Sequence, residues 1–380
     1  MSSPLIVRER ERPSGAPPLS QAQLPERTVQ DSLVFATVPL GSDGAIRDLY
    51  RSFLGTVRVG RLMEDMDLFS VWTCRAFLLY PPGYFPLIVT AYVDEFELTP
   101  FLPQPDQDIR LRGRVTWTGK TTLEAEVRME QLKGEDWRVL TKAFFVLAAR
   151  TLHNEPMEVN RLRPTTPAEE KIVAAGNQRR QRRFELADDR SLLQAPTSEE
   201  YAMLHSNYLA TLAGGDLSPA CLPETPRRAG CERLSESRLT TTVFAHPIDR
   251  NMYNTVFGGY IMRMAQELSS ANTYLLCNET PILRYISYIA FRRPIKIGTL
   301  MILHSMMTYT EGNFEQLQVC VEVMEPKTGE TVTTNVFYLT YQTASLAPLV
   351  FPDSYSGRWS SLLTSPVLIA SFAAVVYVLG

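Results

Sequence analysis

Two stretches of the sequence combine an opening glycine with apolar residues at helical spacing. The first, around Gly60, reads VGRLMEDMDLFSVW, and the second, around Gly259, reads GGYIMRMAQELSS. Apolar residues three or four positions apart are typical of a helix that buries one face. The pattern predicts two largely buried helices, each beginning at a glycine. Their apolar positions are Leu62, Met63, Met66 and Phe69 in the first, and Ile261, Met262, Ala265 and Leu268 in the second.

Each predicted helix is followed by four runs of alternating or β-branched residues. Such runs, separated by turns that contain proline or glycine, are typical of β-strands. Equivalent positions keep a nearly constant separation, which is 199 residues from Gly60 to Gly259 and 193 residues from Phe144 to Phe337. The sequence therefore predicts an internal duplication. The runs span 86–98, 108–119, 121–132 and 137–150 in the first half, and 282–291, 298–310, 314–326 and 330–342 in the second.

The two predicted units indicate an α+β fold, because a helix that is apolar on most faces must be enclosed by other elements. We expect tandem domains, each an antiparallel sheet wrapped around a central helix. Between them, PAEEKIVAAGNQRRQRRFELADD and PTSEEYAMLHSNYLATL start acidic after a proline and continue with helical periodicity, which predicts a helical linker. The expected limits are 1–33 for a flexible N-terminal segment, 34–152 for domain 1, 153–238 for the linker, 239–355 for domain 2 and 356–380 for an apolar C-terminal tail.

Composition narrows the classes of function. A hydrophobic fraction of 45% and a charged fraction of 21% are those of a globular protein. The formal charge of −3 provides no long-range attraction to nucleic acid, so we expect no nucleic-acid partner. The five cysteines form no CxxC pair, and none of the four histidines lies within five residues of another, so we expect no metal site.

The two ends of the chain carry weak targeting signals. Residues 359–380 have no charged side chain and include the apolar run VLIASFAAVVYVL, which is short for a membrane span unless residues before Pro366 join it. Membrane contact through this tail, a packed terminal segment and an error in the gene model are the interpretations left open. At the other end, arginine and glutamate alternate over residues 8–12, unlike the acid-poor helix of a transit peptide.

The Gly258-Gly259 pair stands where the second helix should begin, and this is a suitable place for hydrolytic chemistry. Such chemistry needs a held water and donors aimed at the developing oxyanion. A helix N-terminus offers unpaired N–H groups, and glycine lets a carbonyl group approach the backbone. Asn254 could hold the water or the carbonyl. The alternative is a structural helix start in which Asn254 is a turn or cap residue.

Among the acidic residues of the two helices we single out Asp67. It lies close to the buried stripe of the first helix, where a carboxylate is costly unless it has a partner or a role. Glu64 and Asp65 are expected to face solvent, where an acid merely favours the helix dipole. Glu267 is the corresponding candidate in the second helix, although Gln266 stands at the position equivalent to Asp67.

A basic run, RRQRR at 179–183, is a candidate phosphate site. Arg179 and Arg180 could hold the phosphates of a nucleotide-bearing carrier, and the alternative is one solvated face of a helix. The sequence contains no GxSxG, P-loop or GxGxxG motif. This absence argues against a serine hydrolase and against the usual nucleotide-binding folds.

Each half of the chain contains longer motifs of its own. The first half contains VRVGRLMEDMD, IVTAYVDEFEL and GRVTWTGKTTLEAEV, and the second contains HPIDRNMYNTVFGGYIMR, ETVTTNVFYLTYQ and PLVFPDSY, with PTSEEYAMLHSNYLATL between them. Together they resemble the double hot-dog acyl-CoA thioesterases, most closely the mitochondrial acyl-coenzyme A thioesterase 9 branch, over roughly residues 30–355. The resemblance implies two hot-dog domains that form a pseudo-dimer and hydrolyse acyl-CoA to a free acid and CoA without a cofactor.

The resemblance also implies an active site shared between the domains. Matched by position, Asp67 would activate a water, Asn254 would position it, and the Gly259 N–H would polarise the thioester carbonyl. Glu267 would serve a mirror-image site, which we expect to be degenerate because its loop has no asparagine and has Val59 where a glycine is expected. The loop from Asn254 to Gly258-Gly259 has one more residue than the NxxGG-like pattern of related branches, so the choice of asparagine stays open. The expected substrate-binding residues are Phe257, Gly258, Arg179 and Arg180.

Exposed strand edges and an apolar helix layer lead us to expect a homo-oligomer. The resemblance implies a mitochondrial location. The apolar tail replaces the polar ending expected of this branch, which leaves a cytoplasmic or membrane-associated location as alternatives. The alternative function is a non-catalytic acyl-CoA or acyl-carrier binding module, motivated by the imperfect first loop. Hot-dog dehydratase chemistry ranks last, because it needs a histidine paired with an acid and neither central helix contains a histidine.

Overall fold

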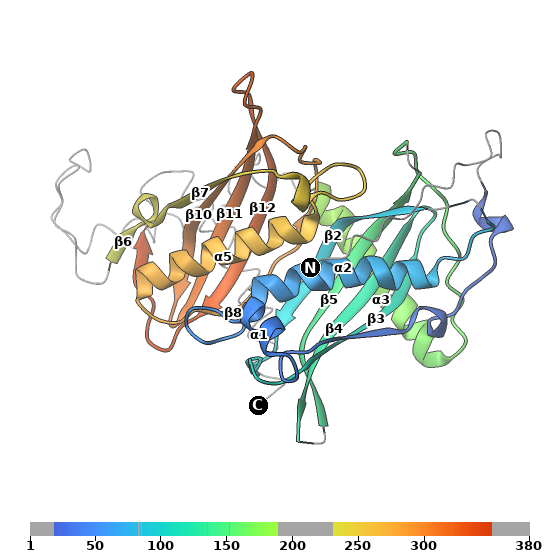
Figure 1. Ribbon diagram of the computed structural model, residues 1–380, viewed down its shortest axis with the longest axis horizontal. Coiled ribbons are helices and arrows are strands. Elements are labelled where there is room, and N and C mark those ends of the chain that lie inside the picture. Colours follow the sequence, from blue (N-terminus) through green and yellow to red (C-terminus); the bar gives the residue numbers. More distant parts are fainter. Residues whose placement is uncertain are drawn as a thin grey trace, which may run out of the picture.

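The computed structural model describes residues 19–188, except 83, 85, 135 and 152, and residues 231–351. In that part of the chain the helices are α1 (Gly44–Tyr50), α2 (Val59–Phe77), α3 (Pro167–Asp188) and α5 (Gly258–Cys277) (Figure 1). The strands of the first half are β1 (Val34–Val38), β2 (Leu87–Leu98), β3 (Ile109–Thr118), β4 (Thr122–Lys133) and β5 (Asp136–Arg150). Those of the second are β6 (Cys231–Arg233), β7 (Leu239–Phe244), β8 (Ile282–Ile286), β9 (Ile289–Ala290), β10 (Leu300–Glu311), β11 (Phe314–Met324), β12 (Thr331–Gln342) and β13 (Leu349–Phe351).

Most of these strands form one antiparallel sheet that passes through both halves (Figure 1). Its order is β1-β3-β4-β5-β2-β8-β12-β11-β10-β7, and the short β9 pairs with β2 near the centre. From β2 outward the first half contains β5, β4, β3 and β1, and from β8 outward the second half contains β12, β11, β10 and β7. The equivalent strands therefore stand in the same order in both halves. The junction of β2 and β8 is formed by the pairs Phe96–Ile286 and Glu97–Tyr285. The duplication inferred from the sequence is therefore present in the course of the chain.

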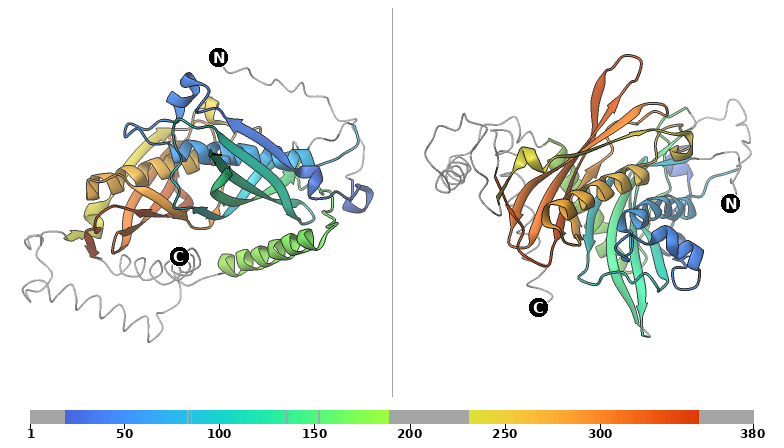
Figure 2. Two further views of the ribbon diagram at one scale, coloured as in Figure 1. Left: turned by 90° about the horizontal axis from the view of Figure 1, so that it is seen from below. Right: turned by 60° about the vertical axis from the view of Figure 1, so that its left-hand side comes forward.

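The helices α2 and α5 lie on the same side of this sheet and pack against each other where the halves meet (Figures 1 and 2). Helix α2 packs on β3 and β4, and α5 packs on β10 and β11. One apolar cluster extends through both halves, so burial of α2 and α5 stabilises a shared core. The eight apolar positions predicted to face inward on the two helices are all buried, as Leu62, Met66, Met262 and Ala265 illustrate with no exposed area.

Several elements differ from those expected from the sequence. The run 282–291 is interrupted at Ser287 and Tyr288, so it forms β8 and β9 instead of one strand. The short strands β1 and β7 were not expected from the sequence. Neither was α1, whose N-cap Asp43 accepts hydrogen bonds from two backbone N–H groups. Of the segment expected to be flexible, 19–33 packs on the first half, where Leu24 and Val29 are buried and Arg27 donates to the Phe77 carbonyl.

Helix α3 begins at Pro167, as the acidic start after proline predicts, and lies on the face of the sheet opposite α2 (Figure 2). Gly176 lets it approach the sheet closely, because a Cβ there would lie 2.6 Å from the Trp117 Cβ. The Asn177 side chain accepts a 2.8 Å hydrogen bond from the Trp117 indole. The second predicted linker helix and the apolar tail lie outside the described residues. Among the residues that are described, no helix has the length and apolar character needed to cross a membrane.

Replacing Gly113 should separate the first-half helix from its sheet. A Cβ at Gly113 would lie 2.1 Å from the Thr73 Oγ1 and 2.9 Å from the Phe69 Cε1, so Gly113→Ala forces α2 away from β3. We expect a loss of about 1–3 kcal/mol of unfolding free energy, measured by chemical denaturation. The control is Gly44→Ala, where no atom lies within 4 Å of the added Cβ. Equal midpoints for the two variants would contradict the proposed close packing.

Candidate functional site

The N-terminus of α5 touches the middle of α2, and two glycines permit the contact. A Cβ on Gly258 would lie 3.3 Å from the Asp67 Oδ2, and a Cβ on Gly259 would lie 3.1 Å from the Asp67 Cβ and 3.0 Å from the Glu64 Cα. Larger residues would therefore push the helices apart. The glycines at this helix start thus bring an acid of one half against the backbone of the other.

Asp67 is fully buried and has one satisfied oxygen. Its Oδ1 accepts a 2.6 Å hydrogen bond from the Thr90 hydroxyl of β2, whereas its Oδ2 has no hydrogen-bond partner among the described residues. Burial raises the pKa of Asp67 from 3.8 to about 6, although the Thr90 hydroxyl and the nearby Gly259 N–H act to lower it. An acid with this pKa is ionised near neutral pH and can accept a proton.

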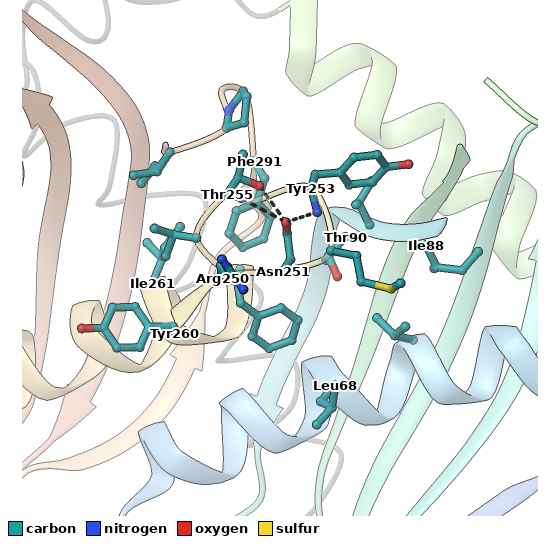
Figure 3. Close-up of a pocket in the computed structure, with 18 of the residues that line it drawn as sticks. Leu68, Ile88, Thr90, Arg250, Asn251, Tyr253, Thr255, Tyr260, Ile261 and Phe291 are labelled. Carbon is teal, nitrogen blue, oxygen red and sulfur yellow. Dashed lines mark hydrogen bonds between the residues drawn. The ribbon is translucent and has the colours of Figure 1, made fainter. Parts of the chain in front are cut away.

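The loop before α5 presents Asn251 to a cavity that Thr90 and Gly258 also line, whereas the buried Asp67 lies behind them and is not itself a lining residue (Figure 3). The Asn251 Oδ1 accepts hydrogen bonds from the Tyr253 N–H at 2.9 Å, the Thr255 N–H at 3.2 Å and the Thr255 hydroxyl at 3.0 Å. These three bonds fix the orientation of the amide. No described residue accepts a hydrogen bond from its Nδ2, which is therefore available as a donor toward the cavity that Asn251 lines.

The structure does not bring Asn254 to this position. Asn254 has a φ of 58° and is exposed at the tip of the loop, and its backbone N–H donates to the Asn251 carbonyl. It is absent from the cavity wall. The left-handed backbone explains why asparagine occupies this turn, so the structural alternative considered for Asn254 fits the geometry. Asn251 was missed because the side-chain bonds that orient it cannot be read from spacing.

The other expected site residues divide into two groups. Phe257 and Gly258 line the cavity, beside Thr90 of β2. Gly259 is buried behind them, and its N–H lies near the Asp67 carboxylate, so the structure places it against the acid. Glu267 is not part of the wall and forms a 2.5 Å ion pair with Arg58 of the first half.

Arg179 and Arg180 belong to α3, which lies on the face of the sheet opposite α2 (Figure 2), and neither of them lines the cavity. The Arg179 guanidinium pairs with the buried Glu124 carboxylate at 2.6 Å and stacks on the Phe144 ring. Arg180 lies over the rings of Trp117 and Phe184. The basic run therefore lies apart from the cavity, and its phosphate-binding role stays a prediction. These side chains attach α3 to the sheet.

The cavity has a volume of about 1040 Å³ and is lined by both halves. Glu64 pairs with Arg61 at 2.7 Å and with Arg263 at 2.9 Å, and Asp65 accepts a 2.5 Å hydrogen bond from the Tyr50 hydroxyl. These contacts compensate the acids in the second turn of α2. Besides Arg61, Glu64 and Asp65, the described lining residues include five arginines and one acid, Asp249. The cavity wall therefore carries excess positive charge. The five arginines are Arg75, Arg150, Arg250, Arg292 and Arg293.

The mirror-image position lacks both chemical groups. The loop before α2 repeats the backbone bonds of the loop before α5, because Ser52 N–H donates to the Thr56 carbonyl as Asn251 N–H donates to the Thr255 carbonyl. A Cβ on Gly60 would lie 2.6 Å from the Gln266 Oε1, so this helix contact is also repeated. Serine therefore stands in place of the asparagine, and glutamine in place of the acid.

The chain is similar in sequence to several acyl-coenzyme A thioesterases. No family model matches it. Acyl-coenzyme A thioesterase 9, mitochondrial, from Bos taurus is 36% identical over 341 residues, which cover 88% of this chain and 77% of the relative. The Homo sapiens protein of the same name is 34% identical over 341 residues, covering 88% and 76%. Acyl-coenzyme A thioesterase 2, chloroplastic, from Humulus lupulus is 27% identical over 350 residues, covering 87% and 76%.

Solved structures also match part of the chain. An acyl-CoA hydrolase from Staphylococcus aureus in complex with butyryl coenzyme A matches with a TM-score of 0.35 and 20% identity, over 40% of this chain and 99% of that one. An apo-hexameric acyl-CoA thioesterase matches with a TM-score of 0.36 and 20% identity, over 38% and 97%. The sequence relatives extend over most of both chains at more than 30% identity. This chain belongs to the acyl-CoA thioesterase family.

Proposed function

We propose that the protein hydrolyses acyl-CoA thioesters to a free acid and CoA at the junction of its two halves. The observation that carries the proposal is the buried Asp67 of α2, whose unpartnered Oδ2 lies against Gly258 of α5. A buried acceptor without a partner is a place where a bound water gains a hydrogen bond. Kinship with named acyl-CoA thioesterases supports the choice of thioester substrate.

In this mechanism Asp67 acts as general base. It takes a proton from the water as the water oxygen bonds to the thioester carbon, and the resulting intermediate expels the CoA thiolate. The Asn251 Nδ2 donates to the carbonyl oxygen or holds the water, and the positive end of the α5 dipole stabilises the developing negative charge. The Gly259 N–H supports the Asp67 carboxylate in place of the direct carbonyl contact that the sequence suggested. Glu267 has no part in the chemistry, because Arg58 holds it in an ion pair.

The exposed arginines of the second half are suited to the phosphates of CoA. Arg250 precedes Asn251, and Arg292 and Arg293 follow Phe291, whose N–H pairs with the Ala91 carbonyl. All three arginines line the cavity and are exposed. Guanidinium groups bind phosphate in a bidentate manner, so we propose this group in place of Arg179 and Arg180.

We propose that the two units are hot-dog domains, 34–152 and 239–355, joined by the linker 153–238 as a pseudo-dimer. The identical order of strands in the two halves and the contact between α2 and α5 support this arrangement. Among the described residues no strand pairs with the outer edge of β1 or β7, which supports assembly into a homo-oligomer. The names of the bovine and human relatives support a mitochondrial location.

Removing either group of the composite site should stop catalysis. We expect Asp67→Asn to lower kcat about 10²–10⁴-fold, because the base is lost, and Asn251→Ala to lower it about 10²–10³-fold, because a donor is lost. Release of CoA thiol is measured with a thiol reagent. Asn254→Gly is the matched control, since glycine accepts the left-handed backbone, and it should retain activity.

Two outcomes would contradict this site. Full activity of Asp67→Asn would remove the proposed base, and loss of activity in Asn254→Gly with retention in Asn251→Ala would restore the original choice of asparagine. Tight binding of an acyl-CoA without thiol release by the unaltered protein would support the alternative, a non-catalytic acyl-CoA binding module.

The pKa of Asp67 sets a pH dependence for activity and for stability. Because the base must be ionised, kcat/KM should rise with pH through an apparent pKa of about 6. Folding raises the pKa of Asp67 from 3.8, so the native state binds the proton more tightly than the unfolded chain. This tighter binding stabilises the native state at low pH, and the stabilisation is lost as pH rises through 6. Relative to Asp67→Asn, the unaltered protein should lose about 3 kcal/mol between about pH 4 and about pH 7. If the difference in denaturation midpoint between the unaltered protein and Asp67→Asn did not change with pH, the raised pKa would be contradicted.

A further inference from the structure

The loop 250–256, which precedes α5, is held by both halves of the molecule. Its base belongs to the second half, where the Val256 N–H donates to the Ile295 carbonyl at 2.8 Å. Its tip carries the proposed donor Asn251. The proposed base Asp67 belongs to the first half, on α2. The separation of the two groups therefore depends on how the tip of this loop is held against the first half.

Tyr253 forms hydrogen bonds at both of its ends. Its backbone N–H donates to the Asn251 Oδ1 at 2.9 Å, and its ring points away from Asn251 (Figure 3). Its hydroxyl donates to the carbonyl of Thr151 in the first half at 2.8 Å. Among the described residues, no other hydrogen bond joins the loop 250–256 to the first half. One residue thus connects the amide of Asn251 with the half that carries the acid.

The carbonyl that accepts this bond belongs to a well-fixed turn. It also accepts a 2.9 Å hydrogen bond from the Asn154 N–H, and the Thr151 N–H donates to the Glu155 carbonyl at 2.8 Å. Asn154 has a φ of 64°, and its own carbonyl accepts a 2.9 Å bond from the Arg150 guanidinium. Thr151 is buried. Because the turn is closed by several hydrogen bonds, its carbonyl can hold the Tyr253 hydroxyl in one place.

The loop of the other half lacks this connection. Gly55 and Asn254 have positive φ angles of 79° and 58° and mark equivalent positions of the two loops. The residues that precede them are Leu54 and Tyr253. A leucine side chain has no hydrogen-bond donor, so it cannot bond to a carbonyl of the opposite half. The tyrosine therefore occurs in the loop that also carries Asn251.

We infer that Tyr253 is a positioning residue for the hydrolysis, because its bond to Thr151 fixes the Asn251 amide relative to Asp67. The inference rests on the proposed function and assigns to it a residue outside the reacting groups. A catalytic group displaced by about 1 Å can lose about 10²-fold in rate, so the position of the loop matters. Burial raises the pKa of the Tyr253 hydroxyl, although Arg150 acts to lower it, so the hydroxyl is protonated near neutral pH and donates.

The alternative is that Tyr253 contacts the substrate directly, since it also lines the cavity. Its hydroxyl has one proton, which it gives to the Thr151 carbonyl, so it could only accept a bond from a substrate. Such a contact would act on substrate binding whether or not Asn251 is present. The two roles therefore differ in KM and in their dependence on Asn251.

A double-mutant cycle separates these roles. Thiol release is measured with a panel from acetyl-CoA to palmitoyl-CoA, for the unaltered protein, Tyr253→Phe, Asn251→Ala and the double variant. Tyr253→Phe should lower kcat about 3- to 30-fold with little change in KM, and in the Asn251→Ala background it should cause no further loss. The control is Tyr338→Phe, which removes a hydroxyl bonded to the Gln318 amide at 2.8 Å outside the cavity and should leave kcat unchanged.

Amide hydrogen exchange tests the connection without a substrate. The N–H groups of Tyr253 and Thr255 donate to the Asn251 Oδ1, so their exchange reports whether the amide keeps its orientation. Tyr253→Phe should speed the exchange of these two groups about 10-fold, because the loop loses its bond to the first half, while exchange within α5 is unchanged. If no ester releases thiol, the proposed function fails separately, and this measurement still decides whether the tyrosine fixes the loop.

Any of three results overturns the inference. The first is an unchanged kcat in Tyr253→Phe. The second is an equal loss with and without Asn251, which would assign the tyrosine to direct substrate contact. The third is unchanged exchange of the Tyr253 and Thr255 N–H groups, which would show that the bond to Thr151 does not hold the loop.

Discussion

The fit of α2 against α5 is the constraint on which the site depends. Both helices cross at glycines, and a side chain at Gly60 or Gly259 would collide with the partner helix. Because the helices approach so closely, the Asp67 carboxylate is sealed from bulk water and held beside the backbone of the other half. Sealing an acid in this way raises its pKa into the range where it can exchange protons at neutral pH. Helix packing and acid–base chemistry thus have the same physical origin here.

The two halves share a backbone plan but differ in side chains at the equivalent positions. The contact of Gly259 with Asp67 is repeated by the contact of Gly60 with Gln266, and the turn at Asn254 is repeated by Gly55, whose φ is 79°. The groups suited to chemistry lie on one side only. At the other, the Gln266 amide donates to the Tyr341 hydroxyl and Arg58 binds Glu267.

Much of the fold could be predicted because its main elements have a strong hydrophobic period. The residues around Leu62 and Ile261 follow the helical period, and β3, β4, β10, β11 and β12 follow alternation or β-branched enrichment, so their limits agree with the structure to within a few residues. The short β1 and β7 were missed because a few residues carry too little periodicity. Their pairing at the sheet edges is decided by tertiary contacts.

The site could be predicted in part. The position of Asp67 on the boundary of the apolar stripe marked it as unusual, but its partner depended on how a loop folds. Asn251 and Asn254 are equally plausible in sequence, and the hydrogen bonds to Thr255 and Tyr253 decide between them. Likewise, the ion pair of Arg179 could not be predicted from the basic run, because its partner, the buried Glu124, lies far away in the sequence.

The replacement of the second acid by Gln266 has an energetic consequence for the duplicated chain. A desolvated carboxylate weakens the native state at neutral pH, and a protein with the acid in both halves would carry that burden twice. An amide at the equivalent place can be enclosed while remaining neutral, and here it is bonded to the tyrosine hydroxyl behind it. The desolvated acid is therefore confined to one half, and the amide at the equivalent place of the other half contributes to cohesion.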